Sequence, residues 1–425
     1  PGGSDDRKAV SDGQRSDWCA APFTRCGTPA VNDATHPSTD RYCPRMGGVR
    51  IGVVAGAGRP GPARIAAPIG DAALDVGALA LADEGPHPEL LTAHTLDPLL
   101  AAGRPAWREV HGWLTDRLAD PDRLTPHLLP AVGLIPTLPF TVADYVDFFA
   151  CEQHASNAAR IFRPGKAVLA PNWKHLPVGY HGRAGTVVVS GTPVTRPSGQ
   201  RGPGDLGPTR ALDVEAELGF VCGGSEPGPI ALDKALDHVF GVVLLNDWSA
   251  RDIQSWESQP LGPLLGKSFA TSISAWITPL DELAAAWTDP PPRDPPPLPY
   301  LLGPADRGLD IALELRINDE VVSRPPSVDL YWTLAQLVSH LTTNGTPLRP
   351  GDLLGSGTVS GARREQRGCL LELSWGGTER IVLADGTSRT YLEDGDEVTI
   401  SATAPAVGGG RLALGEVRGK VRSAR

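Results

Sequence analysis

Glycine and proline residues divide the chain from about residue 140 onwards into short segments rich in alternating apolar residues. Segments of this kind, separated by turn-forming residues, are typical of strands in a large antiparallel or mixed β fold. The strand candidates are "GTVVVSGTPVTRP", "ALDVEAELGFVCG", "LDIALELRINDEVV", "LLELSWGG" and "DEVTISATA". Residues 140–425 are therefore expected to form one large domain of the mixed β (α+β) class.

Two helices stand out within this β-rich part. One is expected over roughly residues 152–162. The other is expected over about residues 328–343, where Asn344-Gly345 supplies a C-terminal stop signal. The apolar stripe of this second helix comprises Leu330, Leu334, Leu337 and Leu341.

Residues 46–139 have a different texture and are expected to form a separate, small mixed β domain. "RIGVVAG" and "RIAAPIG" are short strand candidates, and "GDAALDVGAL" combines a turn, a strand and the start of a helix. A packed helix is predicted further on because four apolar residues recur at helical spacing. These residues are Trp107, Val110, Leu114 and Leu118.

The first 45 residues have little apolar periodicity and many turn-forming residues. Such a segment buries too little apolar surface to offset the entropy lost on ordering. We expect residues 1–45 to be a disordered extension. Met46 is the only methionine, and a strand candidate follows it at once. Our hypothesis is that Met46 is the natural start of the protein.

The composition excludes several classes of function. A formal net charge of −10, without a basic stripe, argues against nucleic-acid binding. The apolar run "VFGVVLL" is far too short to cross a bilayer and suits a buried strand. The six cysteines form no CxxC pair, and reduced thiols in the cytoplasm are the expected state. We therefore expect a cytoplasmic protein that binds neither nucleic acid nor a membrane.

The segment "ALDVEAELGF" places acids at every second position: Asp213, Glu215 and Glu217. Alternating residues of a strand share one face and lie roughly 7 Å apart. Like charges at that distance cost roughly 2 kcal/mol per pair at an effective dielectric constant of about 20. Two interpretations remain open: the face is solvated, or it is enclosed and holds a cation.

Two further acids favour the cation. Asp247 ends the apolar run 239–245, at the tip of a predicted buried strand, where it could also cap the next helix. Asp147 precedes the helix that carries His154, a residue whose alternative role is simple packing. Asp147, Glu215, Glu217 and Asp247 together would form an all-oxygen site, which suits Mg²⁺ or Ca²⁺.

Other polar residues surround these acids in the sequence. Arg251 and Gln254 are three apart and share a helix face. Lys267 lies between apolar runs, where a surface lysine is the simpler interpretation. The glycine-rich "LRPGDLLGSGTVSG" does not match a phosphate-binding loop; it is expected to line a pocket, with Thr358 as a hydroxyl donor.

Eight segments in a fixed order make the chain resemble the fumarylacetoacetate hydrolase family across residues 140–425. They are "DYVDFFACEQHASNAARIFRPG", "PNWKHLPVGYHGRAGTVVVSGTP", "LDVEAELGFVCG", "HVFGVVLLNDWSARDIQSWE", "PLGPLLGKSFATSISAW", "LRPGDLLGSGTVSG", "LLELSWGG" and "DGDEVTISA". The resemblance implies an SH3-like barrel over residues 46–139, a β-roll catalytic domain over residues 140–425, and a homodimer.

The resemblance also implies an activity: hydrolysis of 4-fumarylacetoacetate to fumarate and acetoacetate, the last step of tyrosine breakdown. His154 would be the general base, oriented by Glu372. The residues implied to stabilise the oxyanion are Arg251, Gln254 and Lys267. Those implied around a divalent cation are Asp147, Glu215, Glu217 and Asp247, with Lys267 and Thr271. Those implied to contact substrate include Arg163, Tyr180 and Thr358, besides Arg251 and Gln254.

Two positions depart from the family pattern. Phe149 and Ser258 stand where the family often has tyrosines that face the substrate. Losing one hydrogen bond costs roughly 0.5–1.5 kcal/mol, a few-fold to about tenfold in affinity. An alternative function is therefore hydrolysis of another acylpyruvate or β-diketo acid. A catalytically silent protein is disfavoured because the implied catalytic residues are all present.

Overall fold

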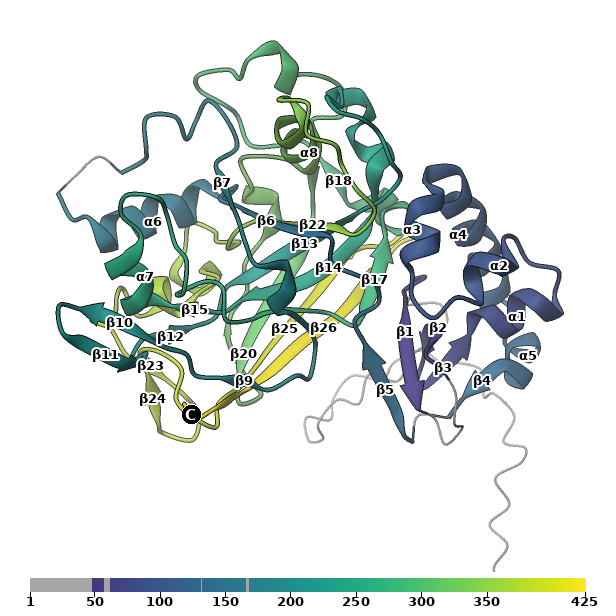
Figure 1. Ribbon diagram of the computed structural model, residues 1–425, viewed down its shortest axis with the longest axis horizontal. Helices are drawn as coiled ribbons and strands as arrows, with labels where there is room; N and C mark the ends of the chain where they lie inside the picture. Colours follow the sequence, from purple (N-terminus) through teal and green to yellow (C-terminus); the bar gives the residue numbers. More distant parts are fainter. Residues whose placement is uncertain (1–47, 57–61, 131, 166–167) are drawn as a thin grey trace, which may run out of the picture. The chain divides into compact units, whose positions relative to one another are not determined.

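The structure, a computed structural model, describes residues 48–56, 62–130, 132–165 and 168–425 (Figure 1). The expectations about residues 1–45, about Met46 and about Cys19, Cys26 and Cys43 lie outside these residues. No helix in the described ranges combines the length and the apolar composition that crossing a bilayer requires. The other cysteines, Cys151, Cys222 and Cys369, are buried and free.

Five antiparallel strands form the N-terminal part of the described residues. Strand β1 (Ile51–Gly56) pairs with β2 (Arg64–Ile69) and β5 (Leu134–Thr137), and β2 leads to β3 (Ala72–Asp75) and β4 (Leu128–Leu129). The strands expected from "RIGVVAG" and "RIAAPIG" are thereby confirmed. Within the described part of the chain no pairing joins β4 to β5, so hydrogen bonds do not close these strands into a barrel.

Helices accompany these strands. Their bounds are α1 (Val76–Ala82), α2 (Pro88–Leu91), α3 (Asp97–Ala102), α4 (Arg104–Leu118) and α5 (Pro121–Leu124). Helix α4 buries the four apolar residues whose spacing predicted it, Trp107, Val110, Leu114 and Leu118. Apolar contacts on this face of α4 join those of β1 and β2 in one cluster, which explains why the helix forms here.

A large mixed sheet continues from β1 into the body of the protein (Figure 1). Its strands run in the order β4-β3-β2-β1-β17-β14-β13-β22-β6-β7, and β16 joins β14 to β8. Their bounds are β6 (Asp144–Phe148), β7 (Gly179–His181), β8 (Val187–Val189), β13 (Ala216–Cys222), β14 (Val239–Asp247), β16 (Thr271–Ile273), β17 (Trp276–Pro279) and β22 (Asp352–Gly355). All nine residues of β14 are buried, as its apolar run predicts.

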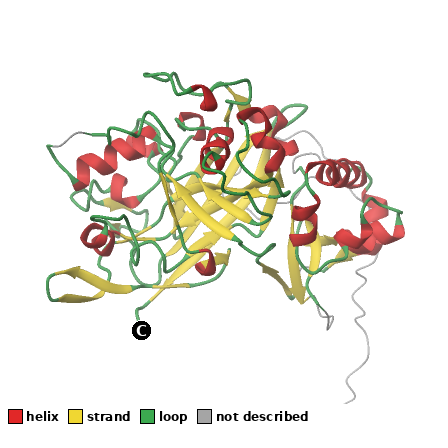
Figure 2. Cartoon of the chain, turned by 45° about the horizontal axis from the view of Figure 1, so that its top comes forward, coloured by secondary structure: helices red, strands yellow, loops and turns green. Residues whose placement is uncertain are grey.

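A second sheet has the order β21-β20-β25-β26-β9. Its strands are β9 (Val194–Thr195), β20 (Ala312–Ile317), β21 (Glu320–Ser323), β25 (Glu397–Pro405) and β26 (Arg411–Arg422). Figure 2 shows long strands crossing near the centre of the β-rich part. Buried side chains of β14, β20, β25 and β26 belong to one apolar cluster, so the main core lies between the sheets.

Short two-stranded ribbons complete the β structure. They are β10 (Ser198–Gly202) with β11 (Asp205–Pro208), β12 (Leu212–Asp213) with β15 (Ser249–Ala250), β18 (Trp287–Thr288) with β19 (Gly308–Leu309), and β23 (Ile381–Val382) with β24 (Ser388–Arg389). The remaining α-helices in the described ranges are α6 (Glu152–Phe162), α7 (Arg251–Glu257), α8 (Leu334–Thr342) and α9 (Leu370–Leu373). Helix α6 has the predicted bounds.

Two predicted elements differ in the structure. Helix α8 begins about six residues later than expected, because Thr333 and Gln336 form a capping box that fixes its first turn. Leu330 therefore precedes the helix. The prediction of a strand in "LLELSWGG" is wrong, because residues 370–373 form the helix α9. The carboxylate of Asp213 accepts hydrogen bonds from the first two amide groups of α9, which have no partner inside a helix.

The acidic strand also differs from its simplest interpretation. "ALDVEAELGF" contributes to two strands, β12 and β13, separated by Val214 and Glu215. Both faces are buried, and Asp213, Glu215 and Glu217 are at most 3% exposed. The solvated face considered above is therefore wrong, and the enclosed charges require partners.

Candidate active site

Four carboxylates converge where β14, β13, β22 and β6 lie side by side. Asp147 lies in β6, Glu217 in β13 and Asp247 at the end of β14, while Glu215 immediately precedes β13. One oxygen from each carboxylate lies within 4.8 Å of the others. None of the four residues is more than 4% exposed.

Gly355 in β22 makes room for two of these acids. It pairs with Asp147 on one side and with Gly219 of β13 on the other. A Cβ atom at position 355 would lie 2.8 Å from Oδ1 of Asp147 and 3.0 Å from Oε2 of Glu217. A side chain at this position would therefore push the carboxylates apart.

The cluster has the chemistry of a cation site. Burial and the charge of Asp247 raise the pKa of Asp147 to about 8, and burial with the charge of Asp147 raises the pKa of Glu217 well above its ordinary value. Oδ1 of Asp147 and Oε1 of Glu217 are buried without a hydrogen-bond partner. Unpartnered carboxylate oxygens in a buried cluster fit a hard divalent cation, which prefers such ligands.

Lys267 supplies one positive charge at the edge of the cluster. It is 5% exposed, so the interpretation as a surface lysine is wrong. Its Nζ donates to Oδ2 of Asp247 at 2.8 Å and also to Oε2 of Glu215. Thr271 donates to Oδ1 of Asp247 at 2.9 Å, and Tyr180 donates to its Oδ2 at 3.0 Å. Asp247 is thus a strand-tip acid inside the site and does not cap α7.

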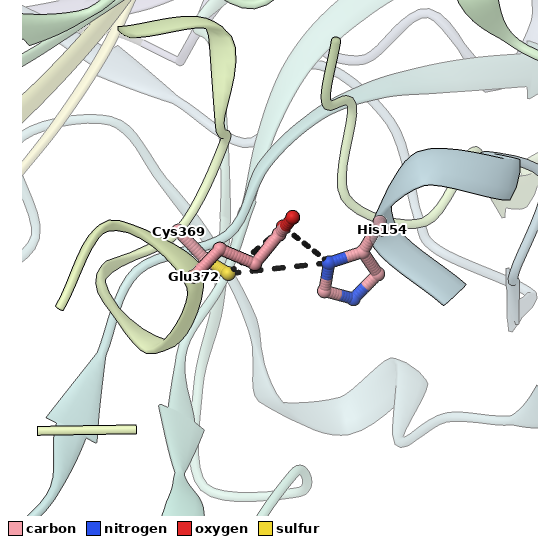
Figure 3. A group of neighbouring side chains, drawn as sticks. All are labelled: His154, Cys369 and Glu372. Carbon is pink, nitrogen blue, oxygen red and sulfur yellow. Dashed lines mark hydrogen bonds and ion pairs between the residues drawn. The ribbon is translucent and has the colours of Figure 1, made fainter. Parts of the chain in front are cut away.

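His154 and Glu372 form a buried pair beside the acids (Figure 3). Nδ1 of the imidazole lies 2.6 Å from Oε1 of Glu372, while Nε2 lies 3.7 Å from Oε1 of Glu215. Burial raises the pKa of Glu372, but the interaction with His154 lowers it below its ordinary value. An ionised Glu372 accepts a hydrogen bond from Nδ1–H, which leaves Nε2 as the atom that can accept a proton.

Three residues that were not predicted from the sequence surround Glu372. Asn157 and Ser360 each donate a hydrogen bond to its carboxylate at 2.7 Å, and the thiol of Cys369 donates at 3.3 Å. Asn157 follows His154 by three residues on α6, a spacing that places both on one helix face. That spacing is the signal that could have identified Asn157. Ser360 and Cys369 carry no comparable pattern.

Arg251 links the acidic residues to the helix α7. Its Nη2 donates to Oε1 of Glu215 at 2.7 Å, its Nε to Oδ2 of Asp213 at 2.8 Å, and its Nη1 to Oε1 of Gln254 at 3.2 Å. Although burial raises it, the charges of Arg251 and Lys267 hold the pKa of Glu215 well below its usual range. Asp213, to which the family resemblance assigns no role, is fully buried and paired with Arg251.

A cavity of about 800 Å³ opens onto these groups. The predicted site residues along its wall are Asp147, Phe149, His154, Arg163, Tyr180, Glu215, Arg251, Gln254, Ser258, Lys267 and Thr358. The other predicted residues lie behind this wall: Glu217, Asp247 and Glu372 contact its members, and Thr271 contacts Asp247. The hydroxyl of Thr358 is buried and has no partner, so it is free to bind a ligand. The structure therefore brings every predicted site residue to one place.

The two departures from the family pattern also lie at this cavity. The ring of Phe149 meets the imidazole of His154 edge-on, with centroids 5.3 Å apart. Ser258 donates its hydroxyl hydrogen to the carbonyl oxygen of Gln254. Neither residue offers the cavity the phenolic hydroxyl that a tyrosine would bring.

Comparisons with known proteins show which family this chain resembles. Residues 145–422 match the protein family described as "Fumarylacetoacetate (FAA) hydrolase C-terminal". A fumarylacetoacetase from Bos taurus is 42% identical over 395 residues, which cover 87% of this chain and 94% of the bovine protein. A fumarylacetoacetase from Oryza sativa subsp. japonica is 44% identical over 394 residues, covering 86% of this chain and 91% of the rice protein.

Solved structures support the fold. A fumarylacetoacetate hydrolase from psychrophilic Exiguobacterium antarcticum has a TM-score of 0.50 at 18% identity, covering 89% of this chain and 100% of its own. A maleylpyruvate hydrolase from Sphingobium sp. SYK-6, in complex with manganese(II) and pyruvate, has a TM-score of 0.50 at 17% identity, covering 88% and 100%. At these identities the likeness concerns the fold alone.

Proposed function

This chain belongs to the fumarylacetoacetate hydrolase family, and we propose that it hydrolyses 4-fumarylacetoacetate to fumarate and acetoacetate in tyrosine breakdown. The observation that carries this proposal is one cavity that joins the His154–Glu372 pair to four buried carboxylates. Such a cavity combines a proton acceptor with a cation site. Both are needed to add water to a diketone and to expel a carbon leaving group.

The four carboxylates would hold the cation. They are Asp147, Glu215, Glu217 and Asp247, with Lys267 and Thr271 at the edge of the site. We propose Mg²⁺ or Ca²⁺, since both prefer oxygen ligands. A divalent cation bound there would supply Lewis acidity toward the keto oxygens of the substrate.

His154 would act as the general base. Its Nε2 would take a proton from water, and Glu372 would stabilise the resulting imidazolium through the 2.6 Å contact with Nδ1. The hydroxyl oxygen would then bond to the keto carbon next to the fumaryl double bond. The C=O π electrons would move to its oxygen and form an alkoxide.

Arg251, Gln254 and Lys267 would stabilise that alkoxide, since all three line the cavity beside His154. Collapse of the alkoxide would break the bond to the neighbouring CH₂ group, whose carbon keeps the electron pair as an enolate. The proton held by His154 would return to that carbon and yield acetoacetate. One water is thus consumed, and no oxidant or reductant is needed.

The remaining lining residues would hold the substrate. Arg163 is an exposed cation at the cavity wall and suits a terminal carboxylate. Tyr180 and Thr358 offer hydroxyl groups, of which that of Thr358 has no partner. Phe149 and Ser258 would shape the substrate preference. Where the family often has a tyrosine hydroxyl, Phe149 offers an apolar ring and Ser258 a short side chain.

The wider expectations also remain proposals. The antiparallel strands β1–β5 support an SH3-like N-terminal domain over residues 46–139, and the two large sheets support a β-roll catalytic domain over residues 140–425. A homodimer and a cytoplasmic location follow from the family resemblance. The three buried free thiols agree with a reducing compartment.

The proposed function is tested by comparing turnover of three diketo acids. Loss of the diketone absorbance would be followed for fumarylacetoacetate, fumarylpyruvate and acetylpyruvate with Mg²⁺ or Ca²⁺ present. We expect the highest kcat/KM for fumarylacetoacetate. Little turnover of this compound together with rapid turnover of another would assign the enzyme to that substrate instead.

A further inference from the structure

We propose that Asp213 is a positioning residue. It holds the oxyanion-stabilising Arg251 and the helix that carries Glu372 in a fixed position relative to each other. The inference rests on the proposed function, because it assigns Arg251 and Glu372 their roles there. Asp213 does not line the cavity, so it acts only through residues that do.

Every lone-pair direction of the Asp213 carboxylate is used. Oδ1 accepts from the backbone N–H of Val214 at 2.8 Å and of Leu370 at 2.7 Å. Oδ2 accepts from Nε of Arg251 at 2.8 Å and from the N–H of Leu371 at 2.9 Å. The residue is fully buried, so water does not compete for these bonds. Four donors in a dry site fix the carboxylate and its partners in one geometry.

The contact with Arg251 fixes one half of the site. Nε bonds to Asp213 while Nη2 bonds to Glu215, so the planar guanidinium is held at two edges. Its remaining atom, Nη1, is directed toward Gln254 at the cavity wall. Without Asp213 the guanidinium would keep a single carboxylate partner and could rotate about that bond.

The contacts with Leu370 and Leu371 fix the other half. Both N–H groups belong to the first turn of α9, and Glu372 is the next residue of that helix. A helix of four residues has little stability of its own, because its first amide groups lack internal partners. Asp213 supplies those partners from a position 157 residues away in the chain. It therefore determines where Glu372 meets His154.

Asp213→Asn tests the assignment sharply. Each carboxylate oxygen accepts two N–H donors. In either orientation the asparagine amide would direct its NH₂ group at two of these donors. The geometry around Arg251 and α9 would then change although the volume of the side chain does not.

Asp396 offers a matched control. It is 3% exposed, and each of its oxygens also accepts two donors, from Arg389, Asn318 and the N–H of Glu393. Neither Asp396 nor any of these partners lines the cavity. Asp396→Asn therefore reproduces the loss of a buried carboxylate paired with arginine, without touching the site.

The measurement is kcat and KM of both variants on the substrate that the wild-type protein turns over best. It is made with saturating metal and well below both unfolding temperatures. We expect Asp213→Asn to lower kcat by about 10- to 100-fold, the usual cost of losing an orienting partner, while KM changes by less than about threefold. Asp396→Asn should leave kcat within about twofold of the wild type, even if it lowers Tm as much as Asp213→Asn does.

A second readout separates positioning from general destabilisation. Because Asp213 acts through Arg251 and Glu372, its substitution should cost much less in an Arg251→Lys or Glu372→Gln background than in the wild type. Fully additive losses would overturn the proposal, as would an Asp213→Asn variant with wild-type kcat. If Asp213→Asn folds poorly, Asp213→Ser and Asp396→Ser replace the pair, since a hydroxyl can accept hydrogen bonds without an N–H clash.

The result is distinguishable from a failure of the proposed function. Absent turnover of fumarylacetoacetate by the wild-type protein would refute that substrate. The ratio of the kcat values of the Asp213 and Asp396 variants would still be measured on the diketo acid that is turned over. That ratio alone decides the role of Asp213.

Discussion

The imidazole Nδ1 of His154 lies 2.6 Å from Oε1 of Glu372, a residue 218 positions further along the chain. Asn157 and Ser360 donate to the same carboxylate, so the group that accepts the hydrogen bond from the imidazole is itself fixed by two other side chains. Nε2 faces the acidic cluster, with Glu215 at 3.7 Å. The ring thus presents its proton-accepting atom on the side where the cation would bind.

Replacing His154 by alanine should abolish hydrolysis while the metal site persists. General-base catalysis contributes about 10²- to 10⁴-fold, and we expect kcat to fall by at least about 10²-fold. The substitution leaves the four clustered carboxylates intact, so added Mg²⁺ or Ca²⁺ should still raise the Tm of His154→Ala. A variant that retains a near wild-type rate would show that another group removes the proton.

Removing the metal should destabilise the protein through the buried acids. Cation binding to the native state adds stability, about 2.7 kcal/mol at a concentration of 100 times Kd. We therefore expect a chelator to lower Tm and Mg²⁺ or Ca²⁺ to restore it, as followed by differential scanning fluorimetry.

Asp147→Asn provides the matched test of this site. The substitution removes one of four mutually repelling carboxylates. It should therefore keep or raise the Tm of the metal-free protein and lose most of the rise caused by metal. An unchanged metal-dependent rise in this variant would place the cation elsewhere.

Phe149→Tyr should lower KM for fumarylacetoacetate by a few-fold to about tenfold, the equivalent of one added hydrogen bond. The ring lies against His154 at the cavity wall, where a hydroxyl could reach the substrate. Phe162→Tyr serves as the control, because Phe162 lines the same cavity but is 39% exposed. An equal effect of both variants, or none from Phe149→Tyr, would contradict a role of position 149 in substrate preference.

The ion pair between Asp396 and Arg389 should make stability depend on acidic pH. Although burial raises it, hydrogen bonds from Arg389 hold the pKa of Asp396 below its ordinary value of 3.8. The stabilisation is therefore complete above that ordinary value and is lost as pH falls through the lower folded-state pKa.

Urea unfolding of wild type and Asp396→Asn measures this contribution. The difference in unfolding free energy should be roughly 1–3 kcal/mol and constant at near-neutral pH. It should shrink below about pH 4. A difference that grows with acidity would mean that the folded-state pKa is raised instead.

Local patterns were sufficient for the elements that form by themselves. The apolar run of β14, the helical spacing along α4 and the bounds of α6 all follow from residues close in sequence. Candidate ligands could also be recognised, because four acids occur in or next to the elements expected around a pocket, without a matching set of histidines or thiols.

Long-range contacts explain what local patterns missed. Residues 370–373 form a helix because Asp213 satisfies its first amide groups, a contact across 157 residues. The alternation of "ALDVEAELGF" suggested one wet face, yet both faces of β13 are covered. The local sequence around Lys267 indicates a surface residue. It is buried because its ammonium group pairs with Asp247 and Glu215, which are distant in sequence.

Hydrolysis of fumarylacetoacetate in H₂¹⁸O tests the central claim most directly. Attack of water on the keto carbon next to the double bond predicts fumarate and acetoacetate in equal amounts, with one ¹⁸O in a carboxylate of fumarate and none in that of acetoacetate. Mass spectrometry of the two products distinguishes these positions. Absence of both products, or fumarate without the label, would contradict the account.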